Sequence, residues 1–224
     1  VMDESALGGK GREYDLNIYN IVNYMHLCME NNPNMVTTLF VHRECILSIT
    51  SVGEMVREAR HKFLHKGAWH RYKGYSYAQL HKMKGKNPEP GSKRDKLRKE
   101  FGFDVKFGYH TVRLLYEVEM ILNEHDIDLR RHREHLKAIR RGEQSMEDIV
   151  AWAASKEKAL ERAYENSSLR HSPDQPAIKT LLLDCLEHHY GSLEAAVSRP
   201  GELEDCLECI EALSNRYRKV KERK

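Results

Sequence analysis

The sequence predicts an α+β protein, in which a small, incomplete mixed β-sheet at the N-terminus precedes a predominantly helical body. Polar residues alternate with β-branched or aromatic ones in DLNIYNI, from Asp15, as in a half-buried strand. Beyond Thr50 the apolar residues recur mostly at helical spacing. With 224 residues, the chain can bury the core of one large domain or two small ones.

The first fifty residues are expected to hold the sheet and one helix. Residues 1–12 are polar and Gly-rich, as in a loop or tail. Residues 21–32 place apolar side chains at helical spacing, and Asn32-Pro33-Asn34 should end this helix. Residues 35–41 and 45–50 fit either strands or short buried helices, and their periodicity leaves both open.

The body is expected to be a series of helices. Ser51 is placed to cap the first, over 52–64, with Glu54 completing a capping box. A polar loop with two prolines, GKNPEPGSK (85–93), is the clearest break. The other predicted helices are 67–83, 104–123, 132–141, 145–167, 173–190 and 201–221. We divide the chain into an α/β portion (1–50), a basic helical region (51–170) and C-terminal helices (171–224).

Positive charge is concentrated in the middle of the chain. Residues 57–113 contain 16 Lys and Arg against 5 Asp and Glu, a net charge of +11, whereas the whole chain carries only +3. A basic segment within a nearly neutral protein favours a surface that binds polyanions such as nucleic acid. The alternative is a helical protein whose solvated faces are unevenly charged.

Composition also argues against several protein classes. No apolar run reaches 18 residues, so no membrane span is expected, and the first twelve residues lack the apolar core of a signal peptide. Five scattered cysteines do not form a disulfide framework. The sequence therefore predicts a cytoplasmic protein with reduced thiols.

Two stripes of polar side chains could bind a phosphorylated ligand. Lys106, His110 and Arg113 are spaced i, i+4 and i+7, which places them within about 60° of arc on one helix face. Stacked cations are costly unless an anion lies among them, and a triphosphate or a nucleic-acid backbone would serve. Tyr75, Gln79 and Lys82 repeat this spacing and would line the same cleft, contacting the nucleotide or the acceptor. Ordinary exposed polar faces are the alternative.

Aromatic residues are interleaved with these charges. Stacking on aromatic rings combined with charge pairing is a common way to bind nucleotides or single strands. Such rings are more often part of a core, so at least half are expected to be buried. They are Trp69, Tyr72, Tyr75, Tyr77, Phe101, Phe103, Phe107 and Tyr109.

Two further patterns contain possible metal ligands. Glu13 and Asp15 would point to the same face of the first strand, where they could hold Mg²⁺ or Mn²⁺. Cys185, His188, Cys206 and Cys209 form C-x2-H and C-x2-C pairs that superficially resemble a zinc site. Both pairs fall within helical patterns with apolar neighbours, which favours buried core cysteines instead.

The order of four segments resembles the predicted nucleotidyltransferases of the DNA polymerase beta superfamily, in bacteria and phages. They are IYNIVNYMHLCMENNPNMVTTLF, GYSYAQLHKM, FGFDVKFGYHTVRLL and HLKAIRRGEQSMEDIV, and the resemblance covers about residues 13–170. The NPN run, K-x3-H-x2-R and IRRGE in this order are its specific parts.

The resemblance implies an activity and a set of roles. Members transfer a nucleoside monophosphate from an NTP, using three acidic residues and divalent metal on a small sheet. It places Asp15 at the third acid, as the catalytic residue and a metal ligand. Glu13, on the same face of the expected strand, would be a second ligand. Lys106, His110 and Arg113 would bind phosphate. The expected acceptor is nucleic acid, with RNA favoured over DNA, or protein.

The chain departs from the family pattern upstream of Asp15. No Gly-Ser turn followed by D-x-D precedes this residue in the sequence. The expectation is either a fragment of a metal-dependent nucleotidyltransferase whose missing motif is supplied elsewhere, or a divergent member without catalysis. Two non-enzymatic hypotheses stay open: a nucleic-acid-binding protein that keeps the scaffold, and a helical interaction subunit.

Overall fold

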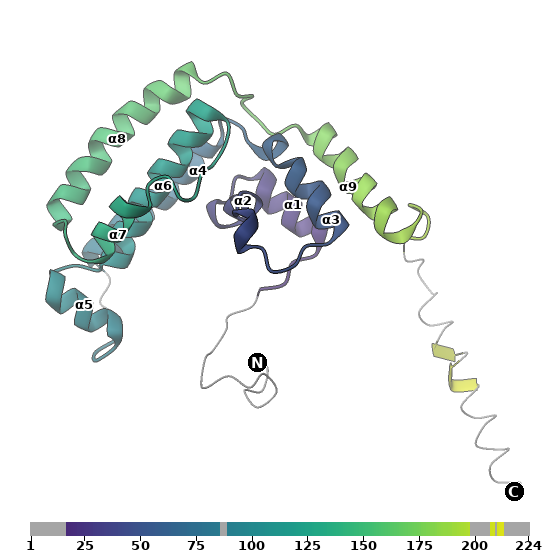
Figure 1. Cartoon of the computed structure of the whole chain (residues 1–224), viewed down its shortest axis with the longest axis horizontal. Helices are drawn as coiled ribbons and strands as arrows, with labels where there is room; N and C mark the ends of the chain where they lie inside the picture. Colours follow the sequence, from purple (N-terminus) through teal and green to yellow (C-terminus); the bar gives the residue numbers. More distant parts are fainter. Residues whose placement is uncertain (1–16, 86–88, 198–206, 209, 213–224) are drawn as a thin grey trace, which may run out of the picture.

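The computed structural model describes residues 17–85, 89–197, 207, 208 and 210–212, and all regular elements in these residues are helices (Figure 1). In chain order they are α1 (Ile21–Met29), α2 (Pro33–Leu39), η2 (Arg43–Cys45), α3 (Ser51–Glu58), η3 (Arg60–Phe63), α4 (Ala68–Gly85), α5 (Lys93–Phe101), α6 (Val105–Glu124), α7 (Arg133–Arg140), α8 (Met146–Asn166) and α9 (Gln175–Tyr190). The η elements are 3-10 helices.

The predicted N-terminal β-sheet, and with it the α+β class, is wrong for the described residues. Residues 35–39 lie in α2, which begins with Asn32 as its cap and Pro33 in its first turn. The hydroxyls of Thr37 and Thr38 donate to backbone carbonyls of the preceding turn, at 2.9 Å and 2.6 Å. A strand also needs a neighbouring strand for its backbone groups, and the described chain offers none to residues 17–20 or 46–50.

The helical body is confirmed. The predictions for 67–83, 104–123, 132–141, 145–167 and 173–190 correspond to α4, α6, α7, α8 and α9, and the one for 21–32 corresponds to α1. The prediction for 52–64 corresponds to α3 followed by η3. Most of the predicted helix 201–221 lies outside the described residues. None of the described helices is long and apolar enough to cross a membrane.

One helix start differs from the prediction. The cap of α3 is Thr50, whose hydroxyl accepts from the backbone N–H of Gly53 at 3.2 Å, whereas Ser51 is the first helical residue. The expected capping partner Glu54 pairs instead with Arg43. A capping box occurs at α8, where Ser145 and Asp148 bond reciprocally.

The helices form two lobes (Figure 1). The long-helix lobe contains α4, α6, α7 and α8, with α5 at one end, and the short-helix lobe contains α1, α2, α3 and α9. A shared apolar core joins them, because buried residues of α4 and α6 belong to the same cluster as those of the short helices. Tyr72 and Val118 lie in it, together with Cys28 and Phe63. A second cluster, including Met83, Val112, Ile139 and Ile149, lies between α4, α6, α7 and α8.

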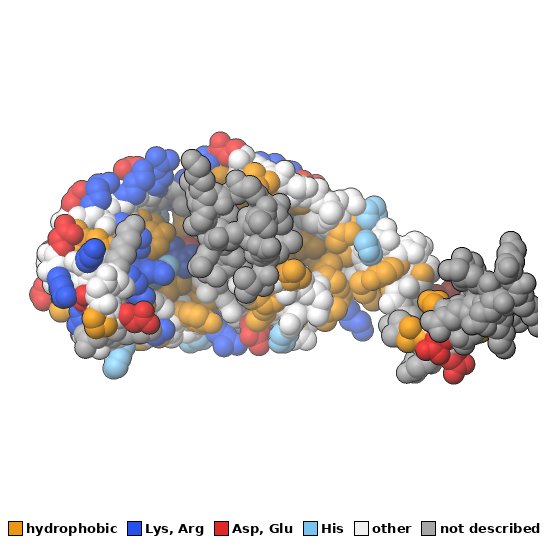
Figure 2. Space-filling view, turned by 90° about the horizontal axis from the view of Figure 1, so that it is seen from below, with side chains coloured by type: hydrophobic (Ala, Val, Ile, Leu, Met, Phe, Trp, Pro, Cys, Tyr) orange, Lys and Arg blue, Asp and Glu red, His pale blue; other side chains and the backbone are white. Residues whose placement is uncertain are grey.

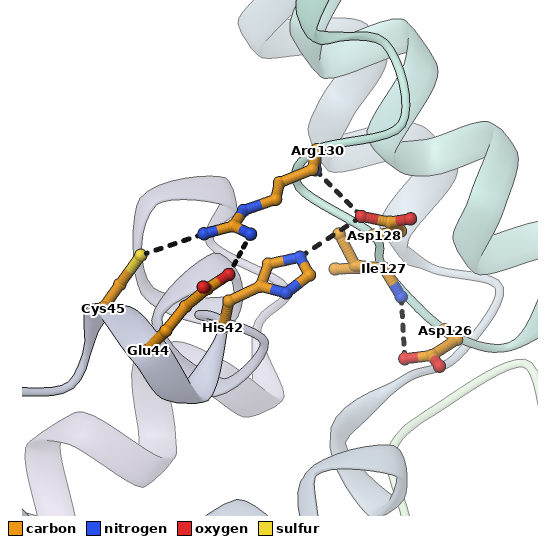
Figure 3. A network of polar contacts seen from close by, with 7 residues as sticks. All are labelled: His42, Glu44, Cys45, Asp126, Ile127, Asp128 and Arg130. Atoms are coloured by element: carbon orange, nitrogen blue, oxygen red, sulfur yellow. Dashed lines mark hydrogen bonds and ion pairs between the residues drawn. The ribbon is translucent and has the colours of Figure 1, made fainter.

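Polar contacts also join the connection between α6 and α7 to the short-helix lobe (Figure 3). Arg130 pairs with Glu44, and its Nη2 lies 3.6 Å from the Cys45 sulfur. Nε2 of His42 lies 3.4 Å from Oδ1 of Asp128, which also accepts from the backbone N–H of Arg130 at 2.9 Å. These side chains are largely exposed, so solvent screening leaves each pair a small contribution to stability. The apolar core therefore holds the lobes together.

Candidate functional site

The N-terminal half of α6 carries a stripe of titratable side chains. Asp104 caps this helix, and its Oδ1 accepts from the backbone N–H of Lys106 at 3.0 Å. Because the following residues are helical, Lys106, His110, Arg113 and Glu117 lie within about 60° of arc. Lys106 is exposed, His110 and Arg113 are half-buried and Glu117 is buried. The predicted K-x3-H-x2-R stripe is therefore one continuous face.

Arginines from two other helices act on the same face. The pKa of His110 is lowered to about 4, first by burial and then by the positive charges of Arg113, Lys106, Arg140 and Arg94. Arg94 comes from α5 and Arg140 from α7. His110 is therefore a neutral imidazole at pH 7 that can donate or accept a hydrogen bond. We call these five residues the cationic face.

Aromatic rings and one carboxylate hold the two added arginines. Nε of Arg94 donates to Oδ2 of Asp104 at 3.0 Å, and its guanidinium lies 4.7 Å from the centre of the Phe107 ring. The guanidinium of Arg140 lies 5.6 Å from the centre of the Tyr109 ring. Lys106 and Arg140 form no ion pair with any residue that the structure describes. Positive charge on this face is therefore only partly neutralised.

His110 predicts a pH effect on stability. Its folded-state pKa lies below the unfolded value of 6.5, so its contribution to stability is complete above pH 6.5 and is lost as pH falls towards 4. Over this range the unfolding free energy of the wild type should fall by about 1–2 kcal/mol more than that of His110→Gln, allowing for solvent screening. Urea unfolding between pH 4 and 7 measures this difference. His81→Gln, at an exposed position on α4, is the control, and a His110→Gln profile parallel to the wild type would contradict the prediction.

A buried carboxyl group lies next to Arg113. Nη1 of Arg113 donates to Oε1 of Glu117 at 3.1 Å, and the Glu117 side chain is only 3% exposed. Burial raises the pKa of Glu117 to about 7, although Arg113 acts in the opposite direction. Tyr72 of α4 is buried within the electrostatic reach of both groups. The inner side of the cationic face is therefore a polar cluster inside the protein.

The second predicted stripe, Tyr75, Gln79 and Lys82, lies on α4, the helix that packs against α6. Lys73 and Tyr77 of α4 both contact Glu157 of α8. Tyr75, Gln79 and Lys82 lie about 140–160° around α4 from Tyr77, so they face away from α8. Tyr75 and Lys82 are exposed and Gln79 is half-buried.

The stripe on α6 also faces away from α8. Glu119 of α6 pairs with Lys156 of α8, and Lys106, His110 and Arg113 lie about 120–180° around the helix from Glu119. Since α4 and α6 pack together, both stripes face the side of this pair opposite α8. No hydrogen bond or ion pair between described residues joins the two stripes. Lys and Arg side chains border a hollow of the long-helix lobe in Figure 2.

The predicted metal ligands are not brought together by the described structure. Glu13 and Asp15 lie outside the described residues, as do Cys206 and Cys209. Cys185 is a core residue, 1% exposed, and Nε2 of His188 lies 2.8 Å from the Ser51 hydroxyl. Among the described residues, no group of three or more His, Cys, Asp or Glu side chains could hold a metal ion. Cys28, Cys45 and Cys185 are free thiols.

Burial of the interleaved aromatic residues agrees with expectation. Trp69, Tyr72, Phe103 and Phe107 are buried, which is half of the eight. The exposed Tyr75 lines a surface depression of about 350 Å³ with His70, Arg71, Gly74 and Ala78. An accessible ring beside a cation fits base stacking better than the buried rings do.

Sequence reasoning missed three residues of the site. Arg140 lies within the IRRGE run, and Glu117 follows Arg113 at i+4, so both left a signal in the sequence. Arg94 belongs to α5, a helix that was not predicted because KRDKLRKEF has little apolar periodicity. Its boundary signals were present, in the Ser92 cap and in Gly102, which ends the helix in the left-handed conformation at φ +81°.

Comparison with known protein families identifies a match over most of the chain. The sequence profile of the RlaP family, described as an RNA repair pathway DNA polymerase beta family, matches residues 9–184. No curated protein sequence and no solved structure matches the chain. The matched range contains α1 to α8, most of α9 and the whole cationic face.

Proposed function

The chain belongs to the RNA repair pathway DNA polymerase beta family, and from this we propose that it binds a nucleoside triphosphate on the cationic face and takes part in transferring a nucleoside monophosphate to nucleic acid. The observation that carries the proposal is the position of His110 among four cations from three helices. Such a concentration of partly neutralised charge favours a polyphosphate. We expect RNA rather than DNA as the acceptor.

Four of the five residues of the face have a proposed role. Arg113 and Arg94 would contact phosphate oxygens through their planar guanidinium groups, and the exposed Lys106 would act as a point charge. The neutral His110 would donate one hydrogen bond from its ring N–H. Positive charge beside a leaving pyrophosphate lowers the barrier to phosphoryl-type transfer by offsetting the negative charge that develops there.

The neighbouring stripe of α4 is proposed as the place of the base or the acceptor. Tyr75 offers an exposed ring next to Arg71 and His70, and stacking on such a ring contributes about 1–3 kcal/mol per base. Gln79 and Lys82 lie on the same side of α4. They would add hydrogen bonds to a ligand that spans α4 and α6.

In this proposal Glu13 and Asp15 are the residues that hold the divalent metal. Carboxylate oxygens are the ligands that Mg²⁺ and Mn²⁺ prefer, and no group of three or more His, Cys, Asp or Glu side chains in the described residues could hold a metal ion. When bound, such a metal would neutralise phosphate charge and activate the attacking hydroxyl. The roles of the cationic face do not depend on it.

Incorporation of labelled nucleotide tests the enzymatic claim. With Mg²⁺, a protein that also carries the upstream Gly-Ser turn and D-x-D should transfer label from an NTP to an RNA oligonucleotide, and Asp15→Asn should lower the rate at least about 100-fold, as expected when a group acting on the reacting atoms is lost. Triphosphate binding without metal should change little in this variant. Asp184→Asn, at an exposed position of α9, should keep the wild-type rate.

Two results would contradict this proposal. Absence of transfer to RNA, to DNA and to protein acceptors, even by a protein that carries the upstream Gly-Ser turn and D-x-D, would defeat the enzymatic claim. Strongly salt-dependent oligonucleotide binding without any triphosphate affinity would instead support a non-catalytic nucleic-acid-binding protein. Equal rates for wild type and Asp15→Asn would remove Asp15 from the site.

A further inference from the structure

Glu117 lies beneath the cationic face and contacts it through Arg113. It is one helical turn beyond Arg113 on α6, with its side chain 3% exposed, whereas the Arg113 side chain is 20% exposed. The two side chains are joined by the hydrogen bond from Arg113 Nη1 to Glu117 Oε1, at 3.1 Å. Arg113 therefore spans the distance between a buried carboxyl group and the surface.

Three buried polar atoms of this cluster have no hydrogen-bond partner among the described residues. They are Oε2 of Glu117, Nε of Arg113 and the hydroxyl of Tyr72. A buried polar atom without a partner is destabilising, so each such group in a native structure calls for an explanation. Glu117 is thus held where its ionised form is poorly compensated.

We propose that Glu117 is a positioning residue of the phosphate-binding face, which orients Arg113 and takes up a proton when a phosphorylated ligand binds. The proposal rests on the proposed function, because it needs a phosphate group at Arg113. An ionised Glu117 neutralises part of the arginine's charge, whereas a protonated Glu117 leaves the full charge to the ligand. Ligand and proton therefore favour each other.

The direction of this coupling follows from linkage. Burial brings the pKa of Glu117 to about 7, so about half of the molecules carry the proton at pH 7 before ligand binds. A phosphate group near Arg113 adds negative charge and draws on the same guanidinium, and both effects raise the pKa of Glu117 further. Binding of the phosphorylated ligand at pH 7 should therefore be accompanied by the uptake of up to about half a proton per protein molecule at Glu117.

Without ligand, the neighbouring Tyr72, Cys28 and His110 titrate outside the range around pH 7. The groups that interact electrostatically with Glu117 or with its neighbour Tyr72 are Arg113 on α6, Tyr72 itself from α4 and Cys28 from α1. His110 is in turn affected by the charge of Arg113. The pKa of Tyr72 lies well above 10 and that of Cys28 is raised to about 12, both through burial. His110 is neutral above pH 5, although a bound anion would raise its pKa too.

The pH profile of triphosphate binding tests the proposal. Binding of inorganic triphosphate would be measured by calorimetry from pH 6 to 8, for the wild type and for Glu117→Gln, which keeps a neutral hydrogen-bonding group. Titration of the ligand and of His110 is common to both proteins, so the ratio of their affinities isolates Glu117. We expect equal affinities at pH 6 and about five- to tenfold tighter binding by Glu117→Gln at pH 8.

A matched control lies two residues away on the same helix. Glu119→Gln makes the same change on the side of α6 that faces α8, where Glu119 pairs with Lys156. This variant should keep the wild-type pH profile. A purely structural role of Glu117 would move the melting temperature and leave the ratio of affinities independent of pH.

A second measurement needs no variant. In wild-type protein labelled with ¹³C at the glutamate side-chain carboxyl carbons, one signal should titrate near pH 7 and shift to higher pH on addition of inorganic triphosphate. The proposal is overturned if all glutamates titrate below about pH 5.5, or if the Glu117→Gln profile parallels the wild type. Absence of triphosphate binding at every pH would overturn the proposed function instead.

Discussion

Replacing Arg113 with alanine should weaken triphosphate binding by about 1–3 kcal/mol, or roughly 5- to 150-fold, as expected for loss of a charge-assisted contact. Lys106→Ala should have an effect in the same range. Lys106 is exposed and forms no ion pair with described residues, so its loss changes the charge of the face without disturbing the core. Titration calorimetry at fixed ionic strength measures both affinities.

Geometry and charge can be separated at Arg113. Arg113→Lys keeps the charge but loses the planar fork, so it should recover only part of the affinity that alanine loses. Lys179→Ala, at an exposed position of α9, removes one positive charge elsewhere and should leave binding unchanged. Wild-type affinity in both Lys106→Ala and Arg113→Ala would show that triphosphate does not bind this face.

The second large effect is expected at Gly142, in the IRRGE run. This glycine follows α7 with φ +75°, in the left-handed region, and an added Cβ would overlap the ring of Phe101 at the end of α5. Gly142→Ala therefore combines backbone strain with a clash in the second apolar cluster. We expect a loss of about 2–4 kcal/mol in the free energy of unfolding, measured by urea denaturation.

Gly191→Ala provides the matched control. Gly191 ends α9 with φ +83°, and a Cβ there would meet nothing within 4 Å. Its replacement should cost only the strain of about 1 kcal/mol. If the two variants lose equal stability, the close approach of Gly142 to Phe101 does not contribute.

The same contact links α7 to the cationic face. Phe101 is the last residue of α5, the helix that carries Arg94, and Arg140 lies two residues before Gly142. Displacing Phe101 would therefore move two of the four cations that surround His110. Packing therefore explains why glycine occupies position 142: only a residue without a side chain lets α5 lie against the end of α7.

Local sequence signals were sufficient to predict the long helices, but outside α1 they did not predict the secondary structure of residues 17–50. In α6 twelve buried residues repeat at helical spacing, so the period alone identified the helix and its outer stripe. In α2 the β-branched residues Val36, Thr37 and Thr38 suggested a strand as readily as a helix. The Asn32 cap, Pro33 and the absence of a neighbouring strand in the described chain decided for the helix.

The sequence by itself determined the helical body, the basic character of its middle and the alignment of Lys106, His110 and Arg113, because helix periodicity and charge are properties of neighbouring residues in the chain. Only the tertiary structure placed Arg94 and Arg140 beside His110 and buried Glu117 behind Arg113. Burial and electrostatic environment depend on which distant segments pack together. For that reason the pKa values of His110 and Glu117, which move in opposite directions, could not be read from spacing.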